Sequence, residues 1–231
     1  MDKAALIVFA KIPEPGMVKT RLTTLLTPGD AADLYLSMLR DSLRQYDDLG
    51  VAVRLYLAPS MILVPEELVE TSLEVFSQKG EGLGNRMLNA FLETFAAGFS
   101  HIVIIGTDHP TLPTSFLTRA YHALNQAGSV SIGPSEDGGY YLLGMNELYA
   151  NLFTDIEYSR AAVFEKTLDR IGSTSAKLTV LPEWYDVDTP ESLLRLVTDL
   201  ENGVEGAPMT REKIEELKGR YGELTHRAGD A

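Results

Sequence analysis

Residues 4–10 read Ala-Ala-Leu-Ile-Val-Phe-Ala, a continuous apolar run that is closed by Lys11 and two prolines. Its length and its β-branched residues are typical of a strand that is buried on both faces of a sheet. His101-Ile-Val-Ile-Ile-Gly106 is a second run of the same kind. Two such strands separated by helical patterns predict a mostly parallel sheet with helices on both faces.

The rest of the chain alternates between strand-like and helical patterns, as this fold class requires. Strand-like runs cover residues 51–58, 73–77, 130–133, 140–145 and 177–181. Helical spacing begins after the cap-and-proline pair Thr27-Pro28, and recurs over 83–95, 113–124, 163–171 with Ser159 as a candidate cap, 190–200 and 210–221. We therefore predict a single α/β domain over residues 1–202, with ligands at the carboxyl ends of its strands and a C-terminal helical extension over 203–231.

Composition excludes several classes of protein. With 231 residues, 45% hydrophobic and 23% charged, the chain is typical of a globular protein. A net charge of −13 argues against a nucleic-acid partner, and the absence of cysteine removes disulfides, thiolate zinc sites and thiol nucleophiles. The apolar run near the start is too short to span a bilayer, so we expect a cytoplasmic protein without a membrane span.

The loop after the first strand concentrates positive charge in an acidic chain. It carries Lys11, Lys19 and Arg21 around Gly16, and a phosphate would bind at such a spot. Neither a phosphate-loop motif nor a dinucleotide fingerprint is present. A solvated basic loop is an equally good interpretation from composition, and the position after a buried strand favours an anion site.

Carboxylates follow later strands. Asp108 stands in Gly-Thr-Asp-His-Pro, where the second buried strand ends, and could hold a divalent cation or simply stabilise a turn. Asp186 and Asp188 precede the helix that begins at Thr189-Pro190, and alternation places both on one side of an extended segment.

Two glycine-rich segments are further candidates. Glu136-Asp137-Gly138-Gly139-Tyr140 could let a ligand approach the backbone beside a carboxylate, and a tight turn is the alternative. Gly80-Glu-Gly82-Leu-Gly84-Asn-Arg86 leads into a helix and could line a base or ribose, although such glycines are common at helix starts.

Taken together, these motifs resemble one family, the bacterial glycosyltransferase-A-like nucleotide-diphospho-sugar transferases. The resemblance runs in unbroken order over about residues 4–202 and rests on the basic loop, Leu-Gly-Asn-Arg-Met, Gly-Thr-Asp-His-Pro, Glu-Asp-Gly-Gly-Tyr-Tyr-Leu-Leu-Gly and Asp-Val-Asp-Thr-Pro-Glu. More distantly the chain is similar to the molybdopterin guanylyl and phospholactate guanylyl transferases. The family implies a Rossmann-like glycosyltransferase-A fold with a seven-stranded mixed sheet.

The resemblance also implies roles for residues. Nucleotide binding would fall to the basic loop and the helix-start segment, namely Lys11, Gly16, Lys19, Arg21, Gly82, Gly84 and Arg86. Asp108 and Asp188 would ligate Mg²⁺ or Mn²⁺. Asp137 would position the acceptor or act as general base, while Gly138, Gly139 and Tyr140 would contact the transferred group.

Three functions remain open at this point. The first is metal-assisted glycosyl transfer from a nucleotide sugar to a small-molecule acceptor, by a monomer or a homodimer. The second is nucleotidyl transfer from a nucleoside triphosphate to a phosphorylated small molecule, with release of pyrophosphate. The Pro-rich first loop differs from the Gly-rich loop that is usual in nucleotidyltransferases of this superfamily, which favours the first. The third is nucleotide binding without catalysis.

Overall fold

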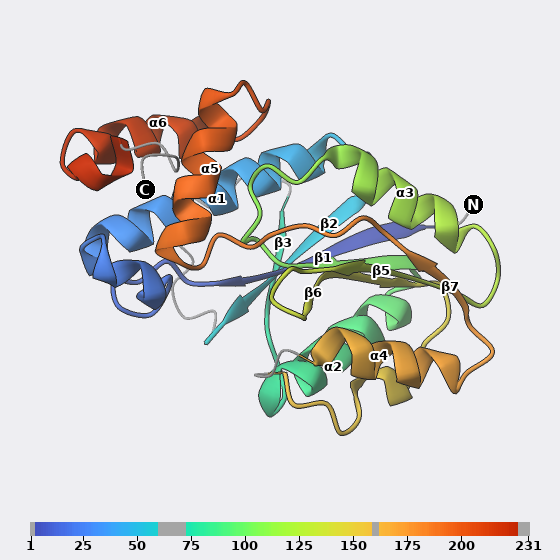
Figure 1. Cartoon of the computed structure of the whole chain (residues 1–231). Helices are drawn as coiled ribbons and strands as arrows, with labels where there is room; N and C mark the ends of the chain where they lie inside the picture. The colour runs from blue at the N-terminus through green and yellow to red at the C-terminus, as the bar shows by residue number, and fades with distance from the viewer. Residues whose placement is uncertain (1–2, 60–72, 159–161, 226–231) are drawn as a thin grey trace. The chain divides into compact units, whose positions relative to one another are not determined.

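A computed structural model describes residues 3–59, 73–158 and 162–225 of the chain (Figure 1). Its elements form two compact units. The first, here called the sheet unit, contains residues 1–10, 46–106 and 113–185. The second, the helical unit, contains residues 11–45, 107–112 and 186–231.

The sheet unit is built on seven strands in the order β3-β2-β1-β4-β6-β5-β7. Strand β6 runs antiparallel to its neighbours β4 and β5, whereas β1 with β4, β2 with β3 and β5 with β7 pair in parallel. This mixed, mostly parallel sheet confirms the predicted fold class. The strands lie where strand-like runs were predicted: β1 (Ala4–Lys11), β2 (Ala52–Ala58), β3 (Glu74–Ser77), β4 (His101–Ile105), β5 (Ser129–Pro134), β6 (Tyr140–Met145) and β7 (Lys177–Val180).

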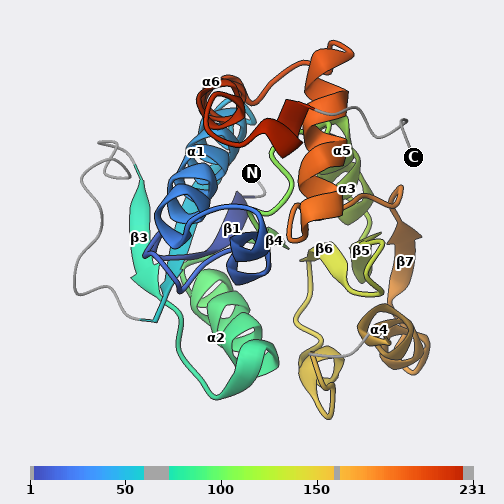
Figure 2. The same ribbon diagram turned by 60° about the vertical axis from the view of Figure 1, so that its left-hand side comes forward.

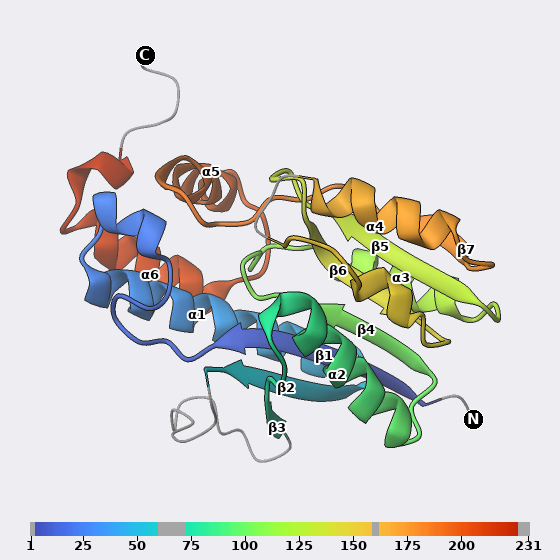
Figure 3. The ribbon, with the colours of Figure 1, turned by 90° about the horizontal axis from the view of Figure 1, so that it is seen from below.

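Helices cover both faces of this sheet within the unit (Figures 1 and 2). On one face lies α3 (Thr114–Leu124), and on the other lie α2 (Gly82–Ala96) and α4 (Val163–Gly172). Figure 3 shows the face that carries α2 and α4, where the short helix η3 (Ala150–Phe153) contacts both. The candidate cap Ser159 falls outside the described residues.

One row of side chains explains why the central strands are so apolar. Ile7 of β1 pairs with Ile104 of β4, Ile104 with Leu143 of β6, and Leu143 with Ile132 of β5. All four belong to one buried cluster, together with Phe91 of α2. Because alternate residues of each strand point to the opposite, α3-covered face, both sets must be apolar, and the sequence shows continuous apolar runs.

The helical unit contains η1 (Thr20–Thr24), α1 (Pro28–Asp47, to Gln45 in this unit), α5 (Pro190–Glu201), α6 (Pro208–Lys218) and η4 (Gly222–Thr225). Thr189 caps α5 in a reciprocal capping box with Ser192, which confirms the predicted helix start. Thr27 likewise accepts a hydrogen bond from the backbone N–H of Asp30 at 3.2 Å, at the start of α1. In the described parts of the chain, no helix has the length and apolar character that a membrane span needs.

Asp41 of α1 caps α6 from outside that helix. The residue before α6 is Ala207, whose side chain has no acceptor. The buried carboxylate of Asp41 fills this role, accepting hydrogen bonds from the backbone N–H groups of Met209 at 3.1 Å and Thr210 at 2.7 Å. The start of α6 therefore depends on a side chain about 170 residues earlier in the chain.

A second carboxylate joins the start of α1 to the C-terminal segment. Buried Asp30 accepts hydrogen bonds from Thr27 Oγ1 at 2.8 Å, Tyr221 Oη at 2.6 Å and Arg220 Nη1 at 2.5 Å. Burial alone would raise the pKa of Asp30, but the hydrogen bonds from Tyr221 and Thr27 and the charge of Arg220 outweigh it and lower the pKa.

Replacing Asp41 by Ala should destabilise the protein by about 1–2 kcal/mol, the usual cost of losing a helix cap. Asp41→Asn should cost less, because it keeps one acceptor oxygen. Asp33→Ala is the matched control on the same helix, since Asp33 is largely exposed and its ion pair with Lys213 should contribute no more than about 0.5 kcal/mol. Urea unfolding of the three variants measures the difference, and equal losses for Asp41→Ala and Asp33→Ala would refute the capping role.

The Asp30 cluster predicts a loss of stability in acid. Because the folded-state pKa of Asp30 is lowered, its ionised form stabilises the fold above the unfolded-state value of about 3.9, and this contribution disappears as the pH falls through the folded-state pKa. The difference in unfolding free energy between wild type and Asp30→Asn should therefore stay constant from about pH 7 to pH 5 and shrink below about pH 4. Urea titrations across this range measure it. A difference that grows toward low pH would contradict the assignment.

Candidate functional site

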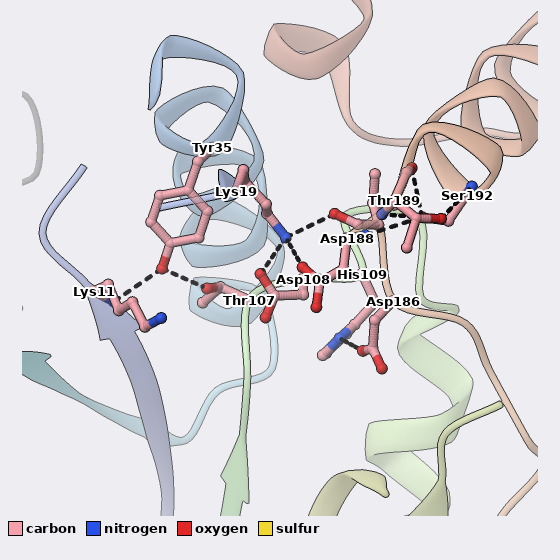
Figure 4. Close-up of polar contacts among 11 residues, drawn as sticks. Lys11, Lys19, Tyr35, Thr107, Asp108, His109, Asp186, Asp188, Thr189 and Ser192 are labelled. Atoms are coloured by element: carbon pink, nitrogen blue, oxygen red, sulfur yellow. Dashed lines mark hydrogen bonds and ion pairs between the residues drawn. The ribbon is translucent and has the colours of Figure 1, made fainter. Parts of the chain in front are cut away.

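Three segments of the helical unit bring together one lysine and two aspartates. Lys19 precedes η1, Asp108 follows β4 by three residues, and Asp188 directly precedes the Thr189 cap of α5. The loops before η1 and around Asp108 and the entry to α5 thus meet around one ammonium group (Figure 4). We call Lys19, Asp108 and Asp188 the ion triad.

All three protons of the Lys19 ammonium are directed at protein oxygens. Nζ lies 2.5 Å from Asp108 Oδ1, 2.8 Å from Asp188 Oδ1 and 2.8 Å from the carbonyl oxygen of Val187. The lysine side chain is 2% exposed, whereas those of Asp108 and Asp188 are 39% and 44% exposed. The triad therefore presents two half-exposed carboxylates over a buried cation.

The charge of Lys19 is fixed by this arrangement. Burial alone would lower the pKa of the lysine, but the charges of Asp108 and Asp188 and the hydrogen bonds to them outweigh the desolvation and raise the pKa above its ordinary value. Lys19 is a permanent cation at neutral pH. It cannot serve as a general base.

The backbone aims Lys19 inward at a local cost. Lys19 adopts the left-handed conformation, with φ 48° and ψ 37°, which is uncommon outside glycine and costs on the order of 1 kcal/mol. Val18 packs with Ala32 and Tyr35 of α1 on one side of it, and Leu22 is fully buried on the other. These anchors hold the strained residue in place.

Tyr35 supports both the lysine and the Asp108 loop. Its hydroxyl forms hydrogen bonds with the backbone N–H of Lys11 at 2.9 Å and with Thr107 Oγ1 at 3.1 Å, and Lys19 Nζ lies 5.6 Å from its ring centre. Burial, with the nearby charge of Asp108, raises the pKa of Tyr35 to about 12, so the phenol remains neutral. Tyr35 is thus a positioning residue.

Asp188 is held by the start of α5. Ser192 Oγ accepts hydrogen bonds from the backbone N–H groups of Asp188 at 2.9 Å and Thr189 at 3.0 Å. The backbone N–H of Val187 donates to the carbonyl of Asp108 at 2.8 Å, which ties the two aspartate segments together. The two carboxylates of the triad are therefore fixed by backbone contacts as well as by Lys19.

Asp186 does not join Asp188, contrary to the alternation predicted from sequence. The backbone N–H of Asp188 donates to the carbonyl of Asp186 at 3.1 Å, so the segment turns here and is not extended. Asp186 Oδ1 instead lies 3.5 Å from Nδ1 of the buried His109. His109 thus contacts Asp186, in the segment that the Val187 N–H ties to Asp108.

The donor set fits a magnesium or manganese ion. Asp108 and Asp188 supply hard carboxylate oxygens, and such ions need only one or two protein carboxylates when phosphates and water complete the shell. Both carboxylates are partly exposed, and among the described residues each uses only Oδ1 in its bond to Lys19. The described chain offers no group of three or more His, Asp or Glu side chains of metal-binding geometry.

The other cations of the basic loop are exposed, unlike Lys19. Lys11 and Arg21 both face solvent. Gly16 has φ 79° in the turn that the Met17 N–H closes by donating to the carbonyl of Glu14 at 3.0 Å. Lys11 and Arg21 remain candidates for phosphate binding, whereas the ammonium of Lys19 is fully engaged in the structure.

The helix-start segment belongs to the sheet unit. Gly82, with φ 71°, begins α2, and Arg86 Nε donates to the carbonyl of Gly80 at 3.2 Å. Gly84 has a packing reason to be glycine, because a Cβ there would lie 2.6 Å from the ring of Tyr158. Packing against Tyr158 therefore explains the glycine at position 84 without a ligand.

The Asp137 loop is a closed turn in the same unit. The Gly139 N–H donates to Asp137 Oδ1 at 2.8 Å, and Gly138 has φ 86°. The hydroxyl of the adjacent Tyr140 lies 3.5 Å from that of Tyr158. Burial, with a smaller contribution from Tyr158, raises the pKa of Tyr140 well above 10. The carboxylate of Asp137 is exposed, and its Oδ2 takes no part in the bond to Gly139.

Sequence reasoning missed the residues that hold the triad. Tyr35 stands in no motif, Thr107 is part of the Gly-Thr-Asp-His-Pro motif but has no predicted role, and the carbonyl of Val187 has no sequence signal. Ser192 could have been found from the Thr-Pro-Glu-Ser pattern, because a residue three positions after a Thr cap often completes a capping box.

Comparisons with known proteins identify the fold and a family. The family of uncharacterized proteins conserved in bacteria, DUF2064, matches residues 43–160, about half of the chain. A structure from Desulfovibrio desulfuricans G20, provisionally assigned as a nucleotide-diphospho-sugar transferase, is 28% identical with a TM-score of 0.89, over 97% of this chain and 98% of that one. This similarity confirms the resemblance drawn from the motifs. No curated protein matches the sequence.

More distant structures share the fold alone. A cytidylyltransferase from Leptospira borgpetersenii is 14% identical with a TM-score of 0.58, over 99% of both chains. Rv0371c from Mycobacterium tuberculosis, in a complex with manganese, is 18% identical with a TM-score of 0.53, over 85% of this chain and 98% of that one.

Removing the triad's cation should destabilise the protein. In Lys19→Met two carboxylates would face each other without a counter-charge, and we expect a loss of about 1–3 kcal/mol, below the usual cost of breaking a buried pair because both aspartates are partly exposed. Urea unfolding in a chelating buffer measures this loss.

Lys11→Met is the matched control, since it removes the same charge from an exposed position of the same loop and should change stability by less than about 0.5 kcal/mol. Adding Asp188→Asn to Lys19→Met should recover part of the loss, because one of the facing charges is gone. If Lys19→Met proves as stable as Lys11→Met, the triad contributes nothing to the fold.

Proposed function

The chain belongs to the bacterial family DUF2064, and we propose that it is a metal-assisted transferase that uses a nucleotide sugar as donor and a small molecule as acceptor. The observation that carries the proposal is the pair of half-exposed carboxylates, Asp108 and Asp188, beside a loop that holds the exposed cations Lys11 and Arg21. A divalent cation and a diphosphate are complementary to such a combination of charges.

In this proposal Asp108 and Asp188 would hold Mg²⁺ or Mn²⁺. The ion would neutralise the negative charge that develops on the leaving diphosphate. Lys11 and Arg21 contribute to the same stabilisation from the basic loop. Tyr35 and Ser192 keep the two carboxylates in place through Thr107 and the start of α5. The rigid support for these side chains is what electrostatic stabilisation requires.

The sheet unit supplies the remaining proposed roles. We assign the turn into α2, with Gly82, Gly84 and Arg86, to the nucleotide base, and Gly138, Gly139 and Tyr140 to the transferred group. Asp137 is the proposed base for the acceptor hydroxyl, through Oδ2, the oxygen that does not accept the Gly139 N–H. The hydrogen bond from the Gly139 N–H orients the carboxylate.

Nucleotidyl transfer is the second candidate, and the shared fold with a cytidylyltransferase is the observation in its favour. The same cations would then hold a triphosphate, and a phosphorylated substrate would displace pyrophosphate. Release of pyrophosphate from a nucleoside triphosphate separates it from glycosyl transfer. A nucleotide-binding protein without catalysis is the third candidate, and slow hydrolysis of a nucleotide sugar would refute it.

Nucleotide sugars should raise the melting temperature of the protein in the presence of Mg²⁺ or Mn²⁺, because a ligand that binds only the native state stabilises it. A ligand at about 100 times its dissociation constant should add about 2.7 kcal/mol. The measurement is a thermal-shift panel of nucleoside diphosphates, triphosphates and nucleotide sugars, each with and without metal.

Asp108→Asn should abolish the metal-dependent part of this shift, while the exposed control Asp33→Asn should leave it unchanged. A preference for a triphosphate would promote nucleotidyl transfer. No response to any nucleotide would refute both transferase proposals.

A further inference from the structure

We propose that Lys19 occupies the cation position of the site, and that a divalent cation at Asp108 and Asp188 displaces its ammonium toward the phosphates of the donor. The inference deepens the proposed function and rests on it for the identity of the donor. It gives the side chain of Lys19 two states. In one it neutralises the carboxylates, and in the other it binds phosphate.

The first argument is that Lys19 and a metal ion need the same oxygens. Asp108 Oδ1 and Asp188 Oδ1 contact the same Nζ atom, at 2.5 and 2.8 Å, so the two oxygens converge on one point. The carbonyl of Val187 completes a set of three oxygens around that point. A cation that used this set would take the space that Nζ fills.

The second argument is electrostatic. The triad carries two negative charges and one positive charge. A divalent cation that bound to the two carboxylates would lie in contact with the Lys19 ammonium and would be repelled by it. Like charges at contact distance repel strongly inside a protein, because the effective dielectric constant there is well below that of water. Movement of the lysine side chain removes this repulsion.

The third argument is that Lys19 can move without unfolding the loop. Val18 and Leu22 are buried on either side of it and fix the backbone, whereas residues 14–17 are exposed. Lysine has a flexible stem of four carbons, so rotation of the side chain alone can carry the ammonium out of the triad. In this account only the side chain of Lys19 moves, and its backbone keeps the left-handed conformation in both states.

This arrangement gives an order to binding. Before a metal ion binds, Lys19 is unavailable to phosphate, and of the three cations of the basic loop only Lys11 and Arg21 are exposed. Once its carboxylates are neutralised by the metal, the ammonium becomes a third cation for the diphosphate. Metal and nucleotide should therefore bind cooperatively, with Lys19 as the connection between them.

The test is chemical labelling of Lys19 in the wild-type protein, with Mg²⁺ alone as the probe. Reductive methylation with formaldehyde and a borane reductant is followed by digestion with a protease that does not cleave at lysine, and by mass spectrometry. Without metal, Lys19 should label slowly because its side chain is 2% exposed, whereas Lys11 and Lys177 should label fast. Saturating Mg²⁺ should raise the rate of methylation at Lys19 by about tenfold and leave that of Lys177 unchanged. A tenfold rise is expected if, without metal, molecules with the ammonium inside the triad outnumber those with it outside by about ten to one.

A second measurement keeps the result independent of labelling chemistry. Binding of Mn²⁺ alone is followed by electron paramagnetic resonance in wild type, Lys19→Met and the charge-matched control Lys177→Met, which removes an exposed lysine of the sheet unit. Lys19→Met should bind Mn²⁺ at least about tenfold more tightly than wild type, and Lys177→Met should differ from wild type by much less. In the presence of Mn²⁺, Lys19→Met should bind a nucleoside diphosphate more weakly than wild type.

Protection of Lys19 that persists at saturating Mg²⁺, with Mn²⁺ bound to wild type, would overturn the inference, because the cation would then bind beside the ammonium. Absence of Mn²⁺ binding to wild type and to Lys19→Met would overturn it as well. Failure of the proposed function looks different: no nucleotide stabilises the protein, while Mg²⁺ still exposes Lys19.

Discussion

A buried ammonium group has to be surrounded by acceptors, and this requirement organises the helical unit. Lys19 can lie inside the protein only because Asp108, Asp188 and the carbonyl of Val187 accept its three protons. These acceptors come from segments about 90 and 170 residues later in the chain. The loop before η1, the loop after β4 and the entry to α5 therefore all contact one ammonium group.

The same requirement explains the supporting contacts. Two carboxylates near one cation repel each other, so their backbones have to be fixed if the geometry is to last. Asp188 is fixed by the capping box of α5, and Asp108 by the bond between its carbonyl and the Val187 N–H. Tyr35 joins the loop before η1 to Thr107. Each of these contacts is a common hydrogen bond of loops and helix ends, and together they hold the carboxylates of Asp108 and Asp188 in fixed positions.

The sequence predicts what depends on local pattern, and fails where distant segments meet. The strands and the Thr189 cap follow from apolar runs and from cap-plus-proline signals, and the structure has them at those places. Asp108 and Asp188 could be singled out because each follows a strand. That both bind the Nζ of Lys19 could not, because the pattern of the basic loop predicts an open anion site and says nothing of carboxylates. The prediction that Asp186 lies on the same side as Asp188 failed for a local reason, because a turn at Val187 interrupts the alternation and Asp186 pairs with His109 instead.

Fold similarity cannot choose between glycosyl and nucleotidyl transfer, because function resides in the site and not in the sheet. The basic loop offers a physical criterion. A glycine-rich loop wraps a triphosphate with successive backbone N–H groups, but Pro13 and Pro15 have none, and the Glu14 and Met17 N–H groups are used inside the loop. A phosphate bound at this loop would therefore depend mainly on side chains, and in our proposal these are Lys11, Arg21 and, once displaced, Lys19. A few side-chain cations suit a diphosphate leaving group better than the enclosed triphosphate of a nucleotidyltransferase, which is why glycosyl transfer stands first.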